Sequence, residues 1–404
     1  MSTSGDSPGM PRGPAHDQRD LVVRHIGRLT TWHGPDLERA AVVIQGGVVS
    51  WTGPDAHLPA GLPEIEEYDA HGMAVLPGFV DSHTHAVWAG SRRDDFIGRL
   101  SGAAYSPHGI QSTVDATRAA SDERLLTLAL RRIAEMQHNG TTTVEVKSGY
   151  GLTVDDELRI LRVAGELQGP RVETTYLGAH VVPDGRDRDD YVHEVAATVP
   201  RAKGAGAQWC DVFCDEGAFT VDEARRILMT AQRNGLGTRI HAEQMANTGA
   251  ARLAADLGCA SADHLDHVTA ADAQALAGAG VVATLVPVAS LYSRSMNWQH
   301  AQTLLDAGCT LAIATDCNPG TAWCESMPYA MQLACLAMGL PVDVVLRAAT
   351  LGGAAALRRT DVGHLGIGAK GDLVVVNSDH AADLLGHLGA IAVIQTVVDG
   401  CPIG

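Results

Sequence analysis

Short apolar runs alternate with amphipathic stretches along most of the chain. About eight of these runs are predicted to be strands: AVLPGFVD (74–81), TTTVEVK (141–147), VETTYLG (172–178), CDVFC (210–214), GTRIHA (237–242), ASADH (260–264), VVATLVP (281–287) and TLAIATD (310–316). Most are followed by a helical pattern, for example at 155–167 and 220–234. Strands and helices that alternate this often are typical of α/β proteins with a (β/α)8 TIM-like barrel rather than of an open sheet.

The two ends of the chain carry a different pattern. Between residues 20 and 71, β-type pieces such as AAVVIQGGVVSWTG are separated by Gly and Pro, as in hairpins. The pieces GAKGDLVVVNSD and AVIQTVVDGCPIG close the chain. We therefore predict a small β-sandwich built from 20–71 and 364–404, a barrel domain over 72–363 and a disordered tail over the polar, turn-rich residues 1–19.

Composition and charge narrow the classes of partner. The chain has 404 residues and a formal net charge of −17, without a run of five Lys or Arg, so its field repels nucleic acid and anionic membranes. No stretch approaches the ~20 apolar residues that span a bilayer. The eight cysteines lack zinc-knuckle spacing and no apolar signal segment precedes them, so we expect a reduced, cytoplasmic protein. We also expect a homodimer, although the sequence does not fix the oligomeric state.

Polar side chains collect where the predicted strands end. They are His83, His85, Lys147, Tyr150, His180, Glu216, His241, Gln244, His264, Asp316 and Asn318. In a barrel, the carboxyl ends of the strands form the rim on which active sites are built. The sequence therefore predicts an active site at this rim.

Four of these residues have the chemistry of metal ligands. His83 and His85 of the HTH motif share one face of an extended chain, about 6–7 Å apart, which suits one metal ion. His241 and Asp316, at the ends of the fifth and eighth strands, would complete a set that suits Zn²⁺ or iron, Fe(II) or Fe(III). Each residue alone is more often structural, but chance rarely places ligand-type residues at four independent strand ends. We therefore predict one divalent metal ion per chain.

Several motifs resemble known enzymes. PGFVDSHTH, HAEQ, SADHL and ATDCNPG resemble the amidohydrolase superfamily, and KSGYGL, YLGAH and DCNPG together resemble its imidazolonepropionase family of histidine degradation. The resemblance covers residues 20 to about 400; HTH alone is common to the superfamily, whereas the second set is specific. It implies metal-dependent hydrolysis of the ring amide C–N bond of 4-imidazolone-5-propanoate to N-formimidoyl-L-glutamate.

This reaction gives the rim residues roles. Asp316 would take a proton from the attacking water and pass it to the leaving ring nitrogen, while His180 or His264 donates to the oxyanion or shuttles a proton. His264 has the alternative role of holding Asp316. By the resemblance, Arg92 binds the propionate, for which its guanidinium fork is suited. The resemblance also places these residues at the ring or its carboxylate: Tyr105, Tyr150, Asn318, Gly320 and Thr321.

Some positions depart from relatives. The fourth strand, in WCDVFCDEG, lacks the lysine that two-metal relatives carboxylate, so one metal is favoured and Lys147 is interpreted as an internal ion-pair partner. The segment SGAAYSPHGIQST, which includes 106–109, is shorter than the common form of the family, so the lid over the ring is expected to differ. Gln244 stands where many deaminases of the superfamily carry Glu, and glutamine binds by hydrogen bonds but cannot shuttle a proton.

Two other functions compete with this interpretation. A deaminase on the same scaffold would also use one metal, but Gln244 disfavours it. A barrel without catalysis, kept as a binding or scaffold protein, would have no reason to retain four ligands together with Arg92 and Tyr150. Metal analysis and a ring-opening assay separate the three possibilities.

Overall fold

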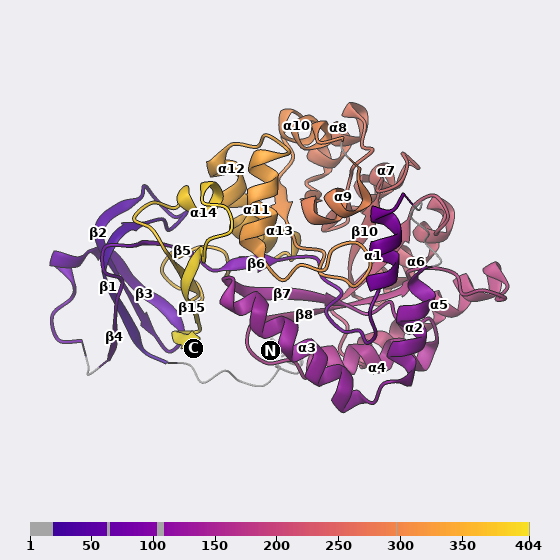
Figure 1. The fold of residues 1–404 in the computed structure, drawn as a ribbon, viewed down its shortest axis with the longest axis horizontal. Helices are drawn as coiled ribbons and strands as arrows, with labels where there is room; N and C mark the ends of the chain where they lie inside the picture. Colours follow the sequence, from indigo (N-terminus) through magenta and orange to yellow (C-terminus); the bar gives the residue numbers. More distant parts are fainter. Residues whose placement is uncertain (1–18, 63–64, 103–108, 296, 404) are drawn as a thin grey trace, which may run out of the picture.

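The computed structural model describes residues 19–62, 65–102, 109–295 and 297–403, and its strands form two sheets (Figure 1). Of the predicted tail, only Arg19 lies within the described residues. One sheet contains eight parallel strands, each paired with the next along the chain. They are β6 (Phe79–Asp81), β7 (Thr141–Lys147), β8 (Arg171–Ala179), β9 (Trp209–Cys214), β10 (Gly237–Ala242), β11 (Ser261–His264), β12 (Val282–Leu285) and β13 (Leu311–Ile313).

The first and last of these strands meet through the segments that follow them. The backbone N–H of Asp316 donates to the carbonyl of His83, and that of His85 donates to the carbonyl of Cys317, both at 3.0 Å. The sheet is therefore a nearly closed barrel, and the predicted (β/α)8 fold is confirmed. The closing hydrogen bonds involve the predicted metal ligands, so fold closure and site assembly are coupled.

Helices surround the barrel. Those that follow its strands are α1 (Arg93–Leu100), α2 (Ile110–Ala119), α3 (Asp122–His138), α4 (Val154–Gly165), α5 (Arg188–Gly204), α6 (Val221–Arg233), α7 (Ala250–Leu257), α8 (Ala270–Ala279), α9 (Pro287–Ser293), α10 (Gln299–Asp306), α11 (Met327–Leu336), α12 (Val342–Arg347) and α13 (Gly353–Ala356). A capping box starts α6: Thr220 accepts from the N–H of Glu223, whose carboxylate accepts from the N–H of Thr220.

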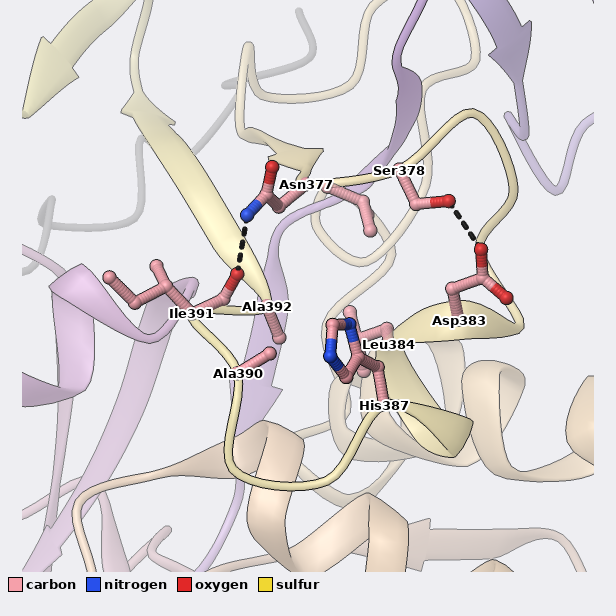
Figure 2. A pocket seen from close by; sticks show the side chains of 9 residues that line it. Asn377, Ser378, Asp383, Leu384, His387, Ala390, Ile391 and Ala392 are labelled. Carbon is pink, nitrogen blue, oxygen red and sulfur yellow. Dashed lines mark hydrogen bonds between the residues drawn. The ribbon is translucent and has the colours of Figure 1, made fainter.

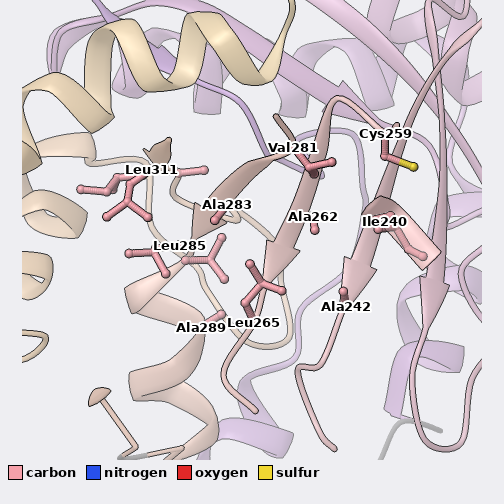
Figure 3. Close-up of a cluster of buried hydrophobic side chains, with 14 of the residues drawn as sticks. Ile240, Ala242, Cys259, Ala262, Leu265, Val281, Ala283, Leu285, Ala289 and Leu311 are labelled. Atoms are coloured by element: carbon pink, nitrogen blue, oxygen red, sulfur yellow. The ribbon is translucent and has the colours of Figure 1, made fainter. Parts of the chain in front are cut away.

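The main core lies between the strands and these helices. Alternate residues of each strand point outward into it, as Figure 3 shows for Ile240 and Ala242 of β10 with Ala262 and Ala283 from the next two strands. Cys210 and Cys214 are buried here. The other residues of each strand are left for the barrel interior, where the polar groups lie.

The second sheet joins both ends of the chain. It contains β1 (Leu21–Leu29), β2 (Leu37–Gln45), β3 (Val48–Pro54), β4 (Glu66–Asp69), β5 (Ala74–Pro77), β14 (Leu373–Val376), β15 (Val393–Val398) and β16 (Cys401–Ile403). The antiparallel pair of β5 and β14 connects the N-terminal strands to the C-terminal ones. Both ends of the chain were predicted to build a small β-sandwich; the structure confirms that they form one β domain, which is a single mixed sheet.

The strand predicted over 74–81 is in fact two strands. Ala74–Pro77 pairs within the second sheet, and only Phe79–Asp81 enters the barrel. Gly78 lies between them because a Cβ there would be 2.3 Å from the side chain of Thr142, and its N–H donates to the carbonyl of Asp372. Gly78 therefore lies where the chain passes from the second sheet into the barrel.

A small pocket opens beside the short helix α14 (Asp383–Gly386) (Figure 2). Three of its polar side chains are already paired: Ser378 donates to Asp383 at 2.5 Å, and Asn377 donates to the carbonyl of Ile391 at 3.1 Å. None of the predicted site residues lines it. Among the described residues, no helix is both long and apolar enough to cross a membrane.

Candidate metal centre

The four predicted ligands converge at the rim of the barrel. The Nε2 atoms of His83 and His85 lie 3.4 and 3.5 Å from the same oxygen, Asp316 Oδ1. The ring of His241 is 4.5 Å from that of His83, between centroids. All four side chains are buried. Two overlapping triads have their ligand atoms within 4.8 Å of one another: His83 with His85 and Asp316, and His83 with His241 and His264.

The geometry of this cluster fits a cation. Within the described part of the chain, His83 Nε2 and both ring nitrogens of His264 are buried and accept or donate no hydrogen bond. Leaving such atoms unpaired costs free energy, whereas a metal ion would use the lone pairs of neutral imidazoles. The imidazoles of His83, His85 and His241, together with the carboxylate of Asp316, form a donor set that suits zinc or iron. The residues present therefore fit one divalent ion.

Burial sets the protonation of these side chains. It lowers the pKa of His83, His85 and His264 well below the usual value, with neighbouring histidines adding to the effect. The imidazoles are thus neutral, as ligation requires. Burial also raises the pKa of Asp316 well above its usual value. A bound cation would oppose that rise, since an adjacent positive charge favours the carboxylate.

The backbone is strained at three positions on this rim. Glu243, His264 and Asp316 have positive φ values of 57°, 78° and 52°. Such conformations are unfavourable for residues with a Cβ and are found where a site over-determines them. In β11, alternation points Asp263 inward and would turn the next residue outward. The left-handed backbone of His264 breaks this alternation, and its ring comes within 5.4 Å of that of His83.

A second set of charged residues supports the imidazoles from below. Asp263 Oδ2 is hydrogen-bonded to His83 Nδ1 at 2.7 Å, and Asp211 Oδ2 lies 3.0 Å from His241 Nδ1. Lys147 Nζ lies 2.8 Å from Asp211 and 2.9 Å from Glu145. The prediction that Lys147 is an internal ion-pair partner is confirmed. The sequence analysis did not find Asp211 and Asp263, although a carboxylate on the inward face of a buried strand is the signal for both.

A cavity lies beside the metal ligands. Its walls include all the predicted substrate-binding residues within the described part of the chain: Arg92, Tyr150, His180, Gln244, Asn318, Gly320 and Thr321. His85, His241, His264 and Asp316 also line it. Tyr105 lies outside the described residues. The structure therefore brings the predicted ligands and the predicted substrate residues into one site.

Arg92 is buried at one wall of this cavity. Its Nε pairs with the carboxylate of Asp95. A Cβ on Gly320 would lie 3.0 Å from Arg92 Nη1, so a glycine at position 320 leaves room for the guanidinium. Arg92 therefore lines the cavity with its Nη1 beside the loop that follows β13.

Asn318 shapes that loop from inside. Its Oδ1 accepts from the N–H groups of Gly320 and Thr321 at 2.8 and 2.7 Å, and its Nδ2 donates to the carbonyl of Asp316. These bonds use both ends of the amide. Asn318 lines the cavity as predicted, and its hydrogen bonds hold the backbone of Gly320 and Thr321 in place.

His180 has a defined tautomer. Its Nδ1 lies 2.8 Å from the carbonyl of Gly149, and because a carbonyl only accepts, Nδ1 carries the hydrogen. Burial, followed by the neighbouring His241, lowers the pKa of His180 to about 4. The ring is therefore neutral near pH 7, and its Nε2 is an acceptor. In this state it cannot donate to an oxyanion.

The segment after β10, which carries Gln244, is held by two carboxylates. Asp215 accepts from the N–H groups of Gln244, Met245 and Ala246 at 2.6, 2.9 and 3.2 Å. Glu243 turns the other way and accepts from the N–H groups of residues 248, 249 and 251. These bonds fix the backbone from which the side chain of Gln244 reaches the cavity.

Comparison with known proteins gives consistent results. The amidohydrolase family matches residues 74–402. An imidazolonepropionase from Salinispora arenicola is 46% identical over 95% of this chain and 98% of its own length, and one from Mycolicibacterium smegmatis is 44% identical over 89% and 91%. A zinc-bound adenosine deaminase from Xanthomonas campestris has a similar fold, with a TM-score of 0.69 and 21% identity over 95% of this chain and 92% of that one. Ochratoxinase from A. niger gives 0.72 at 18% identity, over 95% of each chain.

Proposed function

Because the chain belongs to the imidazolonepropionases of the amidohydrolase family and is a hydrolase, we propose that it hydrolyses the ring amide C–N bond of 4-imidazolone-5-propanoate. The product would be N-formimidoyl-L-glutamate, a step in histidine degradation. One observation supports this most strongly: a single cavity joins the His83, His85, His241 and Asp316 cluster to a buried arginine. That pairing suits a substrate with a hydrolysable ring at one end and a carboxylate at the other.

We propose that these four residues hold one Zn²⁺ or iron ion. Such an ion would act as a Lewis acid and lower the pKa of a coordinated water from 15.7 toward ~7. Asp316 takes the proton from the attacking water and delivers it to the ring nitrogen that leaves, because its Oδ1 borders both His83 and His85. Burial lowers the pKa of His85, so its neutral ring brings no competing proton to this exchange.

His264 is the better partner for the oxyanion that forms at the carbonyl. Its two ring nitrogens have no hydrogen-bond partner among the described residues, so the ring is able to present a donor to the cavity. His180 instead presents the acceptor Nε2, which suits an N–H of the substrate ring. The two histidines thereby divide the roles that the sequence left open between them.

Arg92 binds the propionate in this proposal. Asp95 pairs with its Nε, and its Nη1 beside Gly320 is proposed to donate to the substrate carboxylate. A net charge of −17 repels an anionic substrate at long range, so a buried arginine is needed to attract it locally. Tyr150 and Thr321 are its neighbours on the cavity wall, and Tyr105 remains a predicted contact.

A ring-opening assay tests the proposal. Formation of N-formimidoyl-L-glutamate is measured with purified protein whose zinc and iron contents are determined in parallel, and ammonia release from aminated heterocycles is followed beside it. We expect ring opening that scales with metal content and no ammonia. Ammonia without ring opening would favour the deaminase, and protein that binds metal but turns over neither substrate would refute the proposed reaction.

A further inference from the structure

Five charged side chains are fully buried inside the barrel beneath the metal ligands. We define this charged cluster as Glu145 and Lys147 of β7, Asp211 of β9, Arg239 of β10 and Asp263 of β11. Removing charges from water carries a large free-energy cost, which their mutual attraction offsets only when the geometry is good. Well-packed apolar residues would often serve stability equally well. The cluster therefore calls for a role other than stability.

Two members of the cluster contact metal ligands. Asp263 is hydrogen-bonded to His83 at Nδ1 (2.7 Å), and Asp211 lies 3.0 Å from Nδ1 of His241 without the alignment of a hydrogen bond. A carboxylate at Nδ1 keeps the proton on that nitrogen and leaves the lone pair on Nε2. His83 Nε2 is the atom that faces Asp316 Oδ1. The carboxylates thus select the tautomer in which the imidazoles can bind a cation.

Lys147 connects the two carboxylates. Its Nζ lies 2.8 Å from Asp211 Oδ2, 4.0 Å from Asp263 Oδ2 and 2.9 Å from Glu145 Oε1. Arg239 lies 3.3 Å from Glu145 and donates to the carbonyl of Ser82, directly before His83, at 2.9 Å. Within this cluster, two cationic side chains therefore face three carboxyl groups below the imidazoles.

We propose that Lys147 is a positioning residue of the metal centre, which holds Asp211 and Asp263 against His241 and His83 and thereby sets the affinity for the metal ion. This inference rests on the metal site of the proposed function but not on the identity of the substrate. Lys147 itself contacts neither cavity nor metal ligand in the described structure. Its effect is transmitted by the two carboxylates.

The experiment measures zinc affinity rather than turnover. Full-length wild type and Lys147→Met are loaded with Zn²⁺, and the zinc dissociation constant is measured by competition with a chromogenic chelator, with the melting temperature recorded for each protein. We expect a dissociation constant 10- to 100-fold higher in Lys147→Met, the usual size of an effect from groups that support metal ligands. Asp263→Asn should raise the zinc dissociation constant by the same 10- to 100-fold. It is measured alongside, so that it tests the inference even if Lys147→Met does not fold.

Glu173→Gln is the matched control. Glu173 is another buried carboxylate in a barrel strand, but it pairs with Arg359 at 2.8 Å and accepts from Trp209 Nε1, away from every metal ligand. Its dissociation constant for zinc should stay within about twofold of wild type even where its melting temperature falls. Folded Lys147→Met and Asp263→Asn with wild-type zinc affinity would overturn the inference, as would an equal loss in the control.

A second measurement uses wild-type protein with ¹⁵N-labelled histidine rings. Zinc should shift the Nε2 signals of His83 and His241 while their Nδ1 atoms keep a proton. Zinc bound through Nδ1 of either ring would overturn the inference. Tight zinc binding without ring opening would refute the proposed substrate alone and leave the role of Lys147 standing.

Discussion

At the scale of the residue, Asp316 and Gln244 differ in whether they can exchange a proton. Asp316 borders two metal ligands, so Asp316→Asn removes both a ligand and the base. We expect its ring-opening rate to fall by about 10³-fold or more, even when metal is resupplied. Gln244→Glu, by contrast, should retain substantial ring opening without releasing ammonia. Both rates are measured side by side, and ammonia from Gln244→Glu would show that position 244 alone separates this enzyme from a deaminase.

Arg92 provides a second prediction. If its guanidinium binds the propionate, Arg92→Ala removes one partner of a buried charge pair, a loss of about 2–5 kcal/mol in binding. KM should therefore rise strongly while kcat changes much less. Arg93→Ala is the control, because Arg93 is exposed at the start of α1, and its KM should remain that of wild type. An unchanged KM in Arg92→Ala would move the carboxylate toward Tyr150 and Thr321.

Individual residues were predictable from the sequence to different degrees. His83, His241 and Asp316 were found because ligand-type residues that end a strand must lie on the rim. Asp211 and Asp263 were missed because a single carboxylate within a short apolar run looks incidental until its partner is known. The partners of Asp211 and Asp263 lie on other strands, far away in the sequence. They come together only when the barrel closes, so no local sequence pattern reveals them.

At the scale of the element, the segment after β10 depends on Asp215. This carboxylate accepts from three successive N–H groups, so Asp215→Ala leaves them without their acceptor and frees the backbone that carries Gln244. We expect KM to rise about tenfold and the free energy of unfolding to fall by about 1–3 kcal/mol. Both are measured, the second by urea denaturation.

The control for Asp215 is another carboxylate that binds backbone N–H groups. Asp187 caps α5 by accepting from the N–H of Asp190 at 3.0 Å and does not line the cavity. Asp187→Ala should lower stability by about 1 kcal/mol, as the loss of a helix cap does, with no change in KM. A KM that rises equally in both variants would indicate general loosening rather than a specific role for Asp215.

Element boundaries show where sequence patterns stop being informative. β7 and β10 begin and end as their apolar runs predicted, because regular alternation continues through each. β13 is shorter than predicted, since it spans Leu311–Ile313 instead of 310–316. There Thr315 donates to the buried carboxylate of Asp81, and Asp316 adopts a left-handed conformation. The end of β13 is thus set by tertiary contacts that build the site.

At the scale of the whole molecule, one cluster of charged side chains joins the barrel to the second sheet. Arg171, the first residue of β8, pairs with Asp372, just before β14, and with Asp399, just after β15. The two carboxylates are buried, and burial raises the pKa of Asp372 above its usual value while Arg171 opposes the rise. Without the arginine, two buried carboxylates of the second sheet would lie together at the domain boundary with no cation from the barrel to pair with them.

We therefore expect Arg171→Met to lower the free energy of unfolding by about 3–5 kcal/mol near neutral pH. Without Arg171, the folded-state pKa of Asp372 would rise further above its unfolded value, so the folded chain would bind more protons than the unfolded chain. Stability then falls as pH rises through that window, and the penalty should be larger at pH 7.5 than at pH 5. Urea denaturation of wild type and variant at both values measures it. The control is Arg225→Met, which breaks an exposed pair with Asp256 and should lower the free energy of unfolding by less than about 1 kcal/mol at either pH. An equally small loss in Arg171→Met would mean that this cluster does not couple the two domains.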